Sequence, residues 1–447
     1  MIRTILTFMS MALLGTFSIY GQEMSLKECI NMAVRNNLSL TNARIEMDKG
    51  KNTVSQNRAK LLPVINGVFQ LTDYLVNPVN VTTGTLLGND FPDNPTWQTI
   101  RSTQYNANAG IQLVMPLYNQ TIYAAIDVAK TVNKMSGLAY EKSVDDLTLQ
   151  LGKVYYLAQA AKEQIHLFDD NILRMNKLCE ITEALYQGGV VMEVDVNRVR
   201  INLKNIETQR GQFVTLYKQQ LNLLRFIMDA DPDMPLDVTD MTDGITPVRH
   251  EGVNPSLPEL LLASKQQELI EKRIKTVKAG YLPSIALTGY AGGIGYQEKF
   301  GHFFHTKEAT QNWFGNCFVG LTVKIPIFEA NSKKLQIRQY QYERQQAANR
   351  FELQRKQLDE SYANAMLQLD HNLEVFTTQS DNYRQAENVY NVTEEQYKEG
   401  VASMTALLQD EMQMRNAQVL CVQALCQYNI AQLELLRLSG KLELLSE

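Results

Sequence analysis

The sequence is poor in the residues that build most catalytic and metal centres. Its 447 residues include five cysteines and five histidines, and no CxxC motif or paired Cys/His spacing occurs. An odd number of scattered cysteines argues against a disulfide framework and against a zinc site. Nucleophile-elbow, HExxH and catalytic His/Asp patterns are also absent. The sequence therefore predicts no enzyme, no cofactor and no metal site.

The sequence also lacks a large excess of charge of one sign. Lysine and arginine number 43 against 48 aspartates and glutamates, which gives a net charge of −5. No basic footprint for nucleic acid is present, so no nucleic-acid partner is predicted. With 45% hydrophobic and 20% charged residues, the chain has enough apolar material for a core and is neither disordered nor collagen-like.

Long apolar runs are missing outside the first residues. Arg3 precedes an apolar run from Ile5 to Tyr20, and Gly21 follows it. This pattern predicts a secretory signal peptide over residues 1–21; the alternative of a membrane anchor is less favoured because the run is shorter than the ~20 residues of a span. After residue 21, entry into a membrane would require strands closed into a barrel.

Proline is absent from two long stretches, Leu117 to Asp231 and Ile327 to Glu447. Such stretches predict long helices. Apolar residues follow a 4-3 spacing from Leu147 to Tyr186, and the same phase recurs 211 positions later, from Leu358 to Tyr397. A sustained 3.5-residue repeat predicts coiled-coil packing along the helices.

The helical pattern breaks at one glycine-containing segment in each half of the chain. These segments are Tyr186-Gln-Gly-Gly-Val190 and Tyr397-Lys-Glu-Gly-Val401. Glycine just past a helix end is the usual left-handed cap. The breaks therefore predict two long helical hairpins, over 120–230 and 330–438.

Further landmarks recur and indicate an internal duplication. Leu62-Pro63 returns as Leu282-Pro283, and Met115-Pro-Leu-Tyr118 returns as Ile325-Pro-Ile-Phe328. Each half reads as a helix, two extended segments and a helical hairpin. The predicted domains after the signal peptide are a first repeat over 22–245 and a second over 246–447.

Four segments near the repeated prolines alternate between apolar and polar residues. They lie at about 64–76, 104–115, 284–296 and 312–325, and the third is glycine-rich on both faces. Alternation over about ten residues suits strands of a membrane barrel. Four strands cannot close a barrel, which needs about eight. Either the strands are soluble hairpins, or several chains pool them in one pore.

In this order and recurrence, the motifs resemble the TolC-like outer-membrane efflux proteins, also called outer membrane factors. The segment from Ser25 to Leu38, the two Leu-Pro pairs, the two Pro-apolar-aromatic motifs and the two Tyr-x-x-Gly-Val turns carry the resemblance. It implies a mainly α fold with a β-barrel part. Long coiled-coil hairpins would form an α-barrel, and four strands per chain would contribute to a 12-strand barrel shared by a homotrimer in outer-membrane lipid.

The resemblance also implies a function. The protein would be the passive export duct of a tripartite efflux pump or type I secretion system in a Gram-negative outer membrane. It would dock to a periplasmic adaptor (membrane fusion protein) and, through it, to an inner-membrane pump or ABC exporter. The alternative is a periplasmic adaptor or another soluble coiled-coil scaffold, which would need one hairpin flanked by compact β modules.

Candidate functional residues lie at the two turns. Those expected to contact an adaptor, rather than only to cap hairpins, are Tyr186, Gly188, Gly189, Val190, Tyr397, Gly400 and Val401. Glu193 and Asp195 are candidate acids of the tunnel mouth, and a solvated helix face is the alternative. The second repeat has Ala406 at the position that matches Asp195. The segment His302-Phe-Phe-His305 is interpreted as a polar loop rather than a metal site.

Overall fold

The computed structural model describes residues 22–83, 97–241, 252–303 and 313–445. The predicted signal peptide therefore lies outside the described residues. The chain divides into two compact units: Met1–Met47, Met135–Ser264 and Ala348–Glu447 form the first, and Asp48–Lys134 and Lys265–Ala347 form the second. Each unit combines segments from both sequence repeats. The repeat boundary at 245/246 stays a prediction, because residues 242–251 lie outside the described residues.

Helices make up most of the described chain. They are α2 (Leu26–Asn36), α3 (Leu38–Ala59), α4 (Gln120–Gln187), α5 (Glu193–Met228), α6 (Pro258–Ala279), α7 (Ser332–Lys398) and α8 (Met404–Leu438), with short 3-10 helices η2 (Phe300–Phe303) and η3 (Leu442–Leu445). The first helix begins at a capping box, in which Ser25 and Glu28 satisfy each other's backbone N–H groups.

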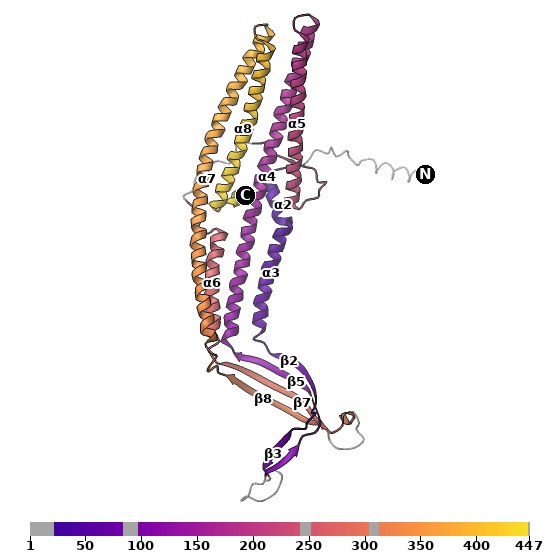
Figure 1. Ribbon diagram of the computed structural model, residues 1–447, viewed down its shortest axis with the longest axis vertical. Helices are drawn as coiled ribbons and strands as arrows, with labels where there is room; N and C mark the ends of the chain where they lie inside the picture. The colour runs from indigo at the N-terminus through magenta and orange to yellow at the C-terminus, as the bar shows by residue number, and fades with distance from the viewer. Residues whose placement is uncertain (1–21, 84–96, 242–251, 304–312, 446–447) are drawn as a thin grey trace, which may run out of the picture. The chain divides into compact units, whose positions relative to one another are not determined.

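In the first unit, the four long helices form two hairpins that lie side by side with their turns at the same end (Figure 1). The predicted seam faces the core: Leu151 and Met175 of α4 are almost completely buried, as are Leu407 and Met414 of α8. These residues pack in clusters that include all four helices. The prediction of a mainly α fold with coiled-coil hairpins is confirmed.

Helix α8 is unusually apolar. Among the described residues, it is the one helix long and apolar enough to pass a test for a membrane span. Just over half of its most apolar window is buried inside the protein, as expected for a core helix. Its apolar character follows from packing against α4, α5 and α7.

The second unit contains a four-stranded antiparallel sheet in the order β2-β5-β7-β8. The strands are β2 (Val64–Asp73), β5 (Tyr105–Tyr118), β7 (Ser284–Gln297) and β8 (Trp313–Lys324). They lie where the alternating segments predict strands. Strands from the two repeats meet at the β5–β7 pair, and β2 and β8 form the edges.

Two smaller strand pairs have no counterpart among the predicted elements. A parallel pair, β1 (Gln22–Met24) with β6 (Leu236–Val238), lies in the first unit, where the hydroxyl of Tyr155 donates to the carbonyl of Met24 at 2.8 Å. An antiparallel pair, β3 (Val79–Thr83) with β4 (Trp97–Arg101), lies in the second unit. Segments this short carry too few alternations to be recognised from sequence.

Candidate channel wall and hairpin turns

The register of the sheet separates its side chains into two faces. Ile65 pairs with Leu113, Leu113 with Gly289, and Gly289 with Val319, so one row of the first face crosses all four strands. The apolar and small residues of this face, called the apolar face below, are Ile65, Gly67, Phe69, Leu71, Tyr105, Ala107, Ala109, Ile111, Leu113, Met115, Ile285, Leu287, Gly289, Ala291, Gly293, Gly295, Trp313, Gly315, Cys317, Val319, Leu321 and Val323. Because side chains alternate with a period of two, one register places all of them on the same side.

The opposite face is polar. Its amide and hydroxyl side chains are Asn66, Gln70, Thr72, Asn106, Asn108, Gln112, Ser284, Thr288, Asn316 and Thr322, and Lys324 lies at its end. Four aromatic residues share this face and come from β7 and β8: Tyr290, Tyr296, Phe314 and Phe318.

The apolar face is uncovered in a single chain. Phe69 of β2 is 73% exposed and Val319 of β8 is 76% exposed. Covering a large apolar side chain is worth about 1.5–3 kcal/mol, so a whole sheet face of this kind requires a cover. Strands of ten to fourteen residues are also long enough to cross a bilayer.

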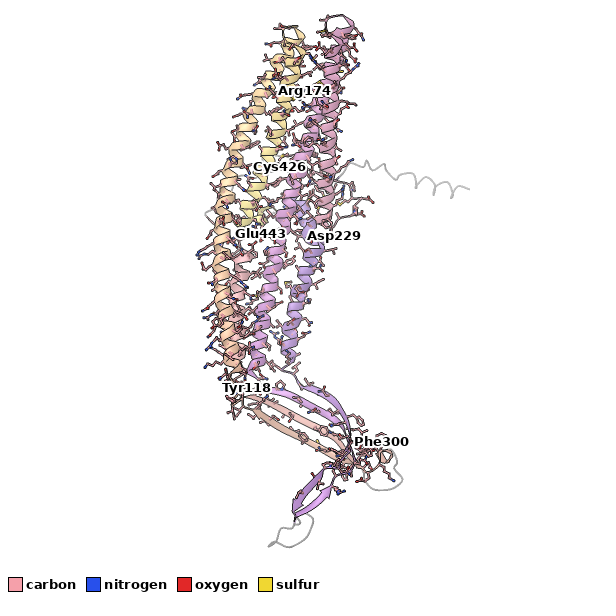
Figure 2. The ribbon with its side chains drawn as sticks, in the orientation of Figure 1. Tyr118, Arg174, Asp229, Phe300, Cys426 and Glu443 are labelled. Carbon is pink, nitrogen blue, oxygen red and sulfur yellow. The ribbon has the colours of Figure 1, made fainter. Side chains whose placement is uncertain are left out.

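Aromatic residues cluster at one end of the sheet, and a tyrosine lies at the other. Near the β7–β8 connection, Phe303 lies 5.8 Å from Trp313 and Phe300 lies 6.0 Å from Tyr105, measured between ring centroids. Tyr118 lies at the opposite end of the sheet from Phe300 (Figure 2). Aromatic girdles at the two edges of an apolar band are typical of membrane barrels.

Several glycines of β7 and of its neighbour β5 lie under aromatic rings, on both faces of the sheet. On the apolar face, a Cβ at Gly295 would lie 3.2 Å from the Trp313 ring. On the polar face, a Cβ at Gly110 or Gly292 would lie 2.5 Å from the Tyr290 hydroxyl oxygen. Rings laid over strand glycines fill the space that the missing side chains leave. This explains why the third strand shows no clean alternation.

In the first unit, the two hairpin turns have the same backbone. Gly189 has φ +74° and Gly400 has φ +78°. The N–H of Val190 donates to the carbonyl of Leu185 at 2.9 Å, and the N–H of Val401 donates to the carbonyl of Gln396 at 2.8 Å. With the matching bonds from the two glycines, both ends are Schellman caps, which require the left-handed residue that glycine supplies.

Most of the residues proposed to contact an adaptor are at the surface of these turns. Exposed members are Tyr186, Gly188, Gly189, Val190, Gly400 and Val401. Tyr397 differs, because it is 9% exposed where its counterpart Tyr186 is 45% exposed. Its ring packs with Met404 and Leu407 in the core. The Tyr397 side chain is therefore not part of the exposed surface of the second turn.

The residues that follow the glycines differ between the two turns. At the start of α5, Met192 is the N-cap residue and its side chain makes no capping bond. At the equivalent start of α8, the Ser403 hydroxyl accepts from the N–H of Ala406 at 3.2 Å. The first tip exposes Val190, Met192 and Val194. The second tip has Val401, Ser403 and Thr405 at these positions.

The two candidate acids at the start of α5 have different surroundings. Glu193 is exposed, whereas the Asp195 side chain is only 19% exposed and lies 3.3 Å from the Arg198 guanidinium. Arg198 also donates to the Thr405 hydroxyl at 3.1 Å, which links α5 to α8. Sequence reasoning missed Arg198, although its i,i+3 spacing from Asp195 was a usable signal.

Further from the tips, a buried polar layer joins the hairpins. Asn171 of α4 donates to Gln418 of α8 at 3.0 Å, and Arg174, labelled in Figure 2, donates to Asn171. Nearby, Glu411 and Arg415 of α8 are 3% and 5% exposed and lie 3.7 Å apart. Buried charges are costly unless paired, and the ion pair between Glu411 and Arg415 lowers that cost.

A second group of charges surrounds Asp145 of α4. Burial, and then the like charge of Asp146, raise the pKa of the Asp145 carboxyl to about 6. Arg437 opposes this shift but does not cancel it. The equivalent position in the second repeat, 211 residues later, is Lys356, which is exposed.

No group of three or more potential metal ligands occurs within the described parts of the chain. His305 lies outside the described residues, and so the interpretation of the His302–His305 segment stays a prediction.

All five cysteines are free, and Cys29 and Cys426 are buried while Cys317 is exposed on the apolar face. Burial raises the pKa of the Cys426 thiol to about 12, so it is a poor metal ligand.

Comparison with known proteins gives one consistent result. A family model described as outer membrane efflux protein matches residues 29–229 and 256–441. The chain is 20% identical over 400 residues to the probable efflux pump outer membrane protein TtgC of Pseudomonas putida, covering 88% of this chain and 78% of the relative. It is 21% identical over 448 residues to outer membrane protein TolC of Escherichia coli, covering 96% and 85%. The structure of outer membrane protein VceC from Vibrio cholerae matches with TM-score 0.72 and 15% identity, covering 93% of this chain and 96% of that chain.

Proposed function

The chain belongs to the outer membrane efflux protein family, and on that basis we propose that three copies of it close one export channel between them. The protein is an outer-membrane channel of an efflux or secretion system in a Gram-negative bacterium, with a large periplasmic part. This replaces the alternative of a soluble adaptor or scaffold.

The observation that carries the proposal is a two-faced sheet with two open edges. The apolar face suits lipid and the polar face suits a water-filled lumen. An open edge leaves backbone N–H and C=O groups without partners, which lipid does not tolerate. Edge strand β2 of one copy would therefore pair with edge strand β8 of the next.

The number of copies follows from how much interior space a barrel of a given number of strands leaves open. Two copies would supply eight strands, and a barrel of about eight strands has an interior that side chains fill. Three copies supply twelve strands and leave an open passage. A homotrimer is thus the smallest assembly that makes both a closed wall and a duct.

The hairpin turns are the proposed site of adaptor docking. The exposed turn residues Tyr186, Gly188, Gly189, Val190, Gly400 and Val401 would be presented three times in a trimer. Contact with a periplasmic adaptor would shift the hairpins relative to each other and open the tunnel mouth, because a partner that binds one arrangement better moves the equilibrium toward it. Energy would come from an inner-membrane pump or ABC exporter, because the channel itself is proposed to have no catalytic activity.

A matched pair of variants tests the assignment of the two faces. Cys317 and Asn316 are neighbours in β8 and point to the apolar and polar faces. Cys317→Arg should cost about 2–4 kcal/mol, because arginine on a lipid face is strongly unfavourable, and should abolish folded trimers. Asn316→Arg should assemble normally and shift ion selectivity toward anions. Equal assembly of both variants would contradict the assignment.

Native mass and planar-bilayer conductance of the detergent-solubilised protein test the assembly itself. We expect the mass of three chains and a steady ion conductance. A monomer that leaves the cell envelope without detergent would overturn the proposal and revive the soluble scaffold.

A further inference from the structure

The two units of the chain differ in charge. The second unit, which contains the sheet, has 19 basic and 11 acidic residues, whereas the first has 24 basic and 37 acidic residues. The net charge of −5 for the whole chain hides this division. A channel wall alone needs no such excess of cations, so their position within the second unit indicates what they contact.

Part of the excess lies where the helices of the second unit meet the sheet. After Glu271, the remainder of α6 has no acid and four basic residues, namely Lys272, Arg273, Lys275 and Lys278. Helix α6 ends five residues before β7 begins, and α4 begins two residues after β5 ends (Figure 1). In the proposed channel this is the periplasmic end of the membrane-crossing strands, because the helices continue from it.

A pocket of about 420 Å³ lies between α4 and α6 at this junction. Its polar lining consists of Gln120, Tyr123 and Asp127 from α4 and Lys272, Lys275 and Lys278 from α6. The pocket follows the first two turns of α4, within about 10 Å of the start of that helix at 1.5 Å per residue. Lipid headgroups occupy a layer that begins where the hydrocarbon core ends, so the pocket lies at headgroup depth.

The pocket is away from the edges through which copies would pair. Helices α4 and α6 connect to the central strands β5 and β7, whereas the edge strands β2 and β8 connect to α3 and α7. Pairing of β2 with β8 of another copy therefore joins other elements than the two that form the walls of this pocket.

Lys275 and Lys278 lie on the open side of α6. Ile274 packs in a cluster with residues of α7, and Lys272 donates to α4, so these neighbours cover two sides of the helix. The helical period places Lys275 and Lys278 on one remaining side and Leu269 on the other. Both lysines are exposed, whereas Leu269 is 4% exposed. A ring of helices crowds side chains on its inner surface, so the open side is the outer one.

Two of the three lysines in the pocket have no partner of opposite charge. Lys272 and Asp127 are each within 3.2 Å of an oppositely charged side chain, so their charges are matched. Lys275 and Lys278 form no ion pair with any described residue. The pocket therefore offers two unmatched cations to an anion.

Apolar surface adjoins these cations on the side of the sheet. Leu282, two residues before β7, also lines the pocket and is 46% exposed, and Tyr123 is 44% exposed. A free phosphate ion would gain nothing from this surface. A phosphate that is attached to acyl chains would use both the cations and the apolar side chains.

We propose that Lys275 and Lys278 bind the phosphate of an anionic phospholipid in the periplasmic leaflet of the outer membrane. The inference rests on the proposed function, because it requires the sheet to cross that membrane. Basic pockets between membrane-associated helices suit acidic headgroups. In a trimer the site occurs three times, as a basic collar where the barrel meets the periplasm.

Titration with dioleoylphosphatidylglycerol tests the site. The lipid is added to the intact, detergent-solubilised channel, and native mass spectrometry counts the molecules retained on the assembled protein. Lys275→Gln/Lys278→Gln should lower the affinity about thirtyfold, at about fivefold for each lysine near an anionic lipid surface. Lys275→Arg/Lys278→Arg keeps both charges and should bind the lipid like the parent.

The matched control is Lys177→Gln/Lys218→Gln, which removes two exposed charges from α4 and α5 in the first unit. It should leave the affinity unchanged. Dioleoylphosphatidylethanolamine has the same acyl chains without the net charge and should bind the parent more weakly. Unchanged affinity in the first double variant, equal loss in the control, or equal affinity for the two lipids would overturn the inference. Displacement of the lipid by an equal concentration of inorganic phosphate would overturn it too.

Planar-bilayer conductance tests the side of the wall on which the lysines lie. On the outer side, their replacement should leave ion selectivity unchanged, whereas a shift toward cations would place them in the lumen and overturn the inference. If the variants form conducting trimers and bind the lipid like the parent, the site is wrong and the channel stands. If the parent protein neither assembles nor conducts, the proposed channel fails and this inference fails with it.

Discussion

At residues 185–190 and again at 396–401, the chain reverses direction between two long helices. In both places a glycine with φ near +75° ends the helix, and the same two backbone hydrogen bonds close the turn. The side chains around this shared backbone are different. The first tip exposes Val190, Met192 and Val194, whereas the second has a valine followed by Ser403 and Thr405.

This difference shows what each turn must preserve. The positive φ of the turn requires glycine, because a residue with a side chain is strained in that conformation. The neighbouring side chains differ in their internal contacts, because Ser403 caps α8 whereas Met192 makes no capping bond at the start of α5. The two turns therefore keep the same backbone geometry and expose chemically distinct surfaces, one apolar and one hydroxyl-bearing.

The largest expected effect comes from breaking the shared backbone. Gly189→Val and Gly400→Val should each cost about 1–2 kcal/mol, because a β-branched residue at positive φ is strained, although no described atom crowds either glycine within 4 Å. The double variant should still form trimers yet fail to export. Thermal unfolding and an export assay measure both effects.

The control for these variants is Gly211→Val in α5. A Cβ at Gly211 would meet no described atom within 4 Å, and its backbone is helical, without the positive φ of the turn glycines. Normal export by the double turn variant would count against docking at the turns. A large difference between the single variants would show that the turns are not equivalent.

A second prediction concerns how the folding stability depends on pH at one pair of equivalent positions in the two repeats. The Asp145 carboxyl has a pKa of about 6 in the folded protein against about 4 when unfolded, so the folded state binds a proton more tightly and loses stability as pH rises from 4 through 6. Asp145→Asn should therefore raise stability by about 1–2 kcal/mol at pH 7.5 and change little at pH 4. Urea unfolding at the two pH values measures it.

Lys356→Gln, at the equivalent position of the second repeat, is the matched control. Lys356 is exposed, and so its replacement should leave the pH dependence of stability unchanged. If Asp145→Asn is equally neutral at pH 7.5, the burial of Asp145 does not penalise its charge.

A third prediction exchanges the helix caps. Ser403→Ala should destabilise the protein by about 1 kcal/mol because the N–H of Ala406 loses its acceptor, and Met192→Ser should stabilise it by a similar or smaller amount. Thermal unfolding of the two single variants gives the values. Shifts of the same sign would mean that the tips differ in more than their caps.

The smallest effect on stability is expected at the link between the tips. Arg198→Ala removes a half-exposed ion pair with Asp195 and the bond to Thr405, so it should cost less than about 1 kcal/mol. Its functional effect should be larger, because the bond joins α5 to α8.

Asp195→Ala should raise single-channel conductance or reduce block by cations, and an unchanged current trace would remove Asp195 from the tunnel mouth.

Patterns with a strict period were readable from the sequence. The 4-3 spacing placed Leu151 and Met175 on the buried side of α4, and the glycine breaks marked the turns. Period-two alternation located β2, β5 and β8. These patterns work because burial on one face of a regular element repeats with the geometry of that element.

Features set by distant partners were not readable. Tyr186 and Tyr397 occupy the same motif, yet one is exposed and the other is buried against Met404. Nothing in the apolar spacing marks the charged residues Glu411 and Arg415 for burial, yet both are buried. In β7, rings from other positions occupy the space over glycines, which hides the alternation.

The unpaired edges of β2 and β8 also bear on how the molecule is made. In a single copy, strands β2 and β8 are free edges that can pair with any extended segment, whether it belongs to another copy or to an unrelated chain. In the proposed trimer, closure requires an encounter with other copies, so its rate would rise with their concentration, and misassembly would compete with it until then. Newly secreted chains should therefore depend on chaperones that shield strand edges until enough copies have arrived.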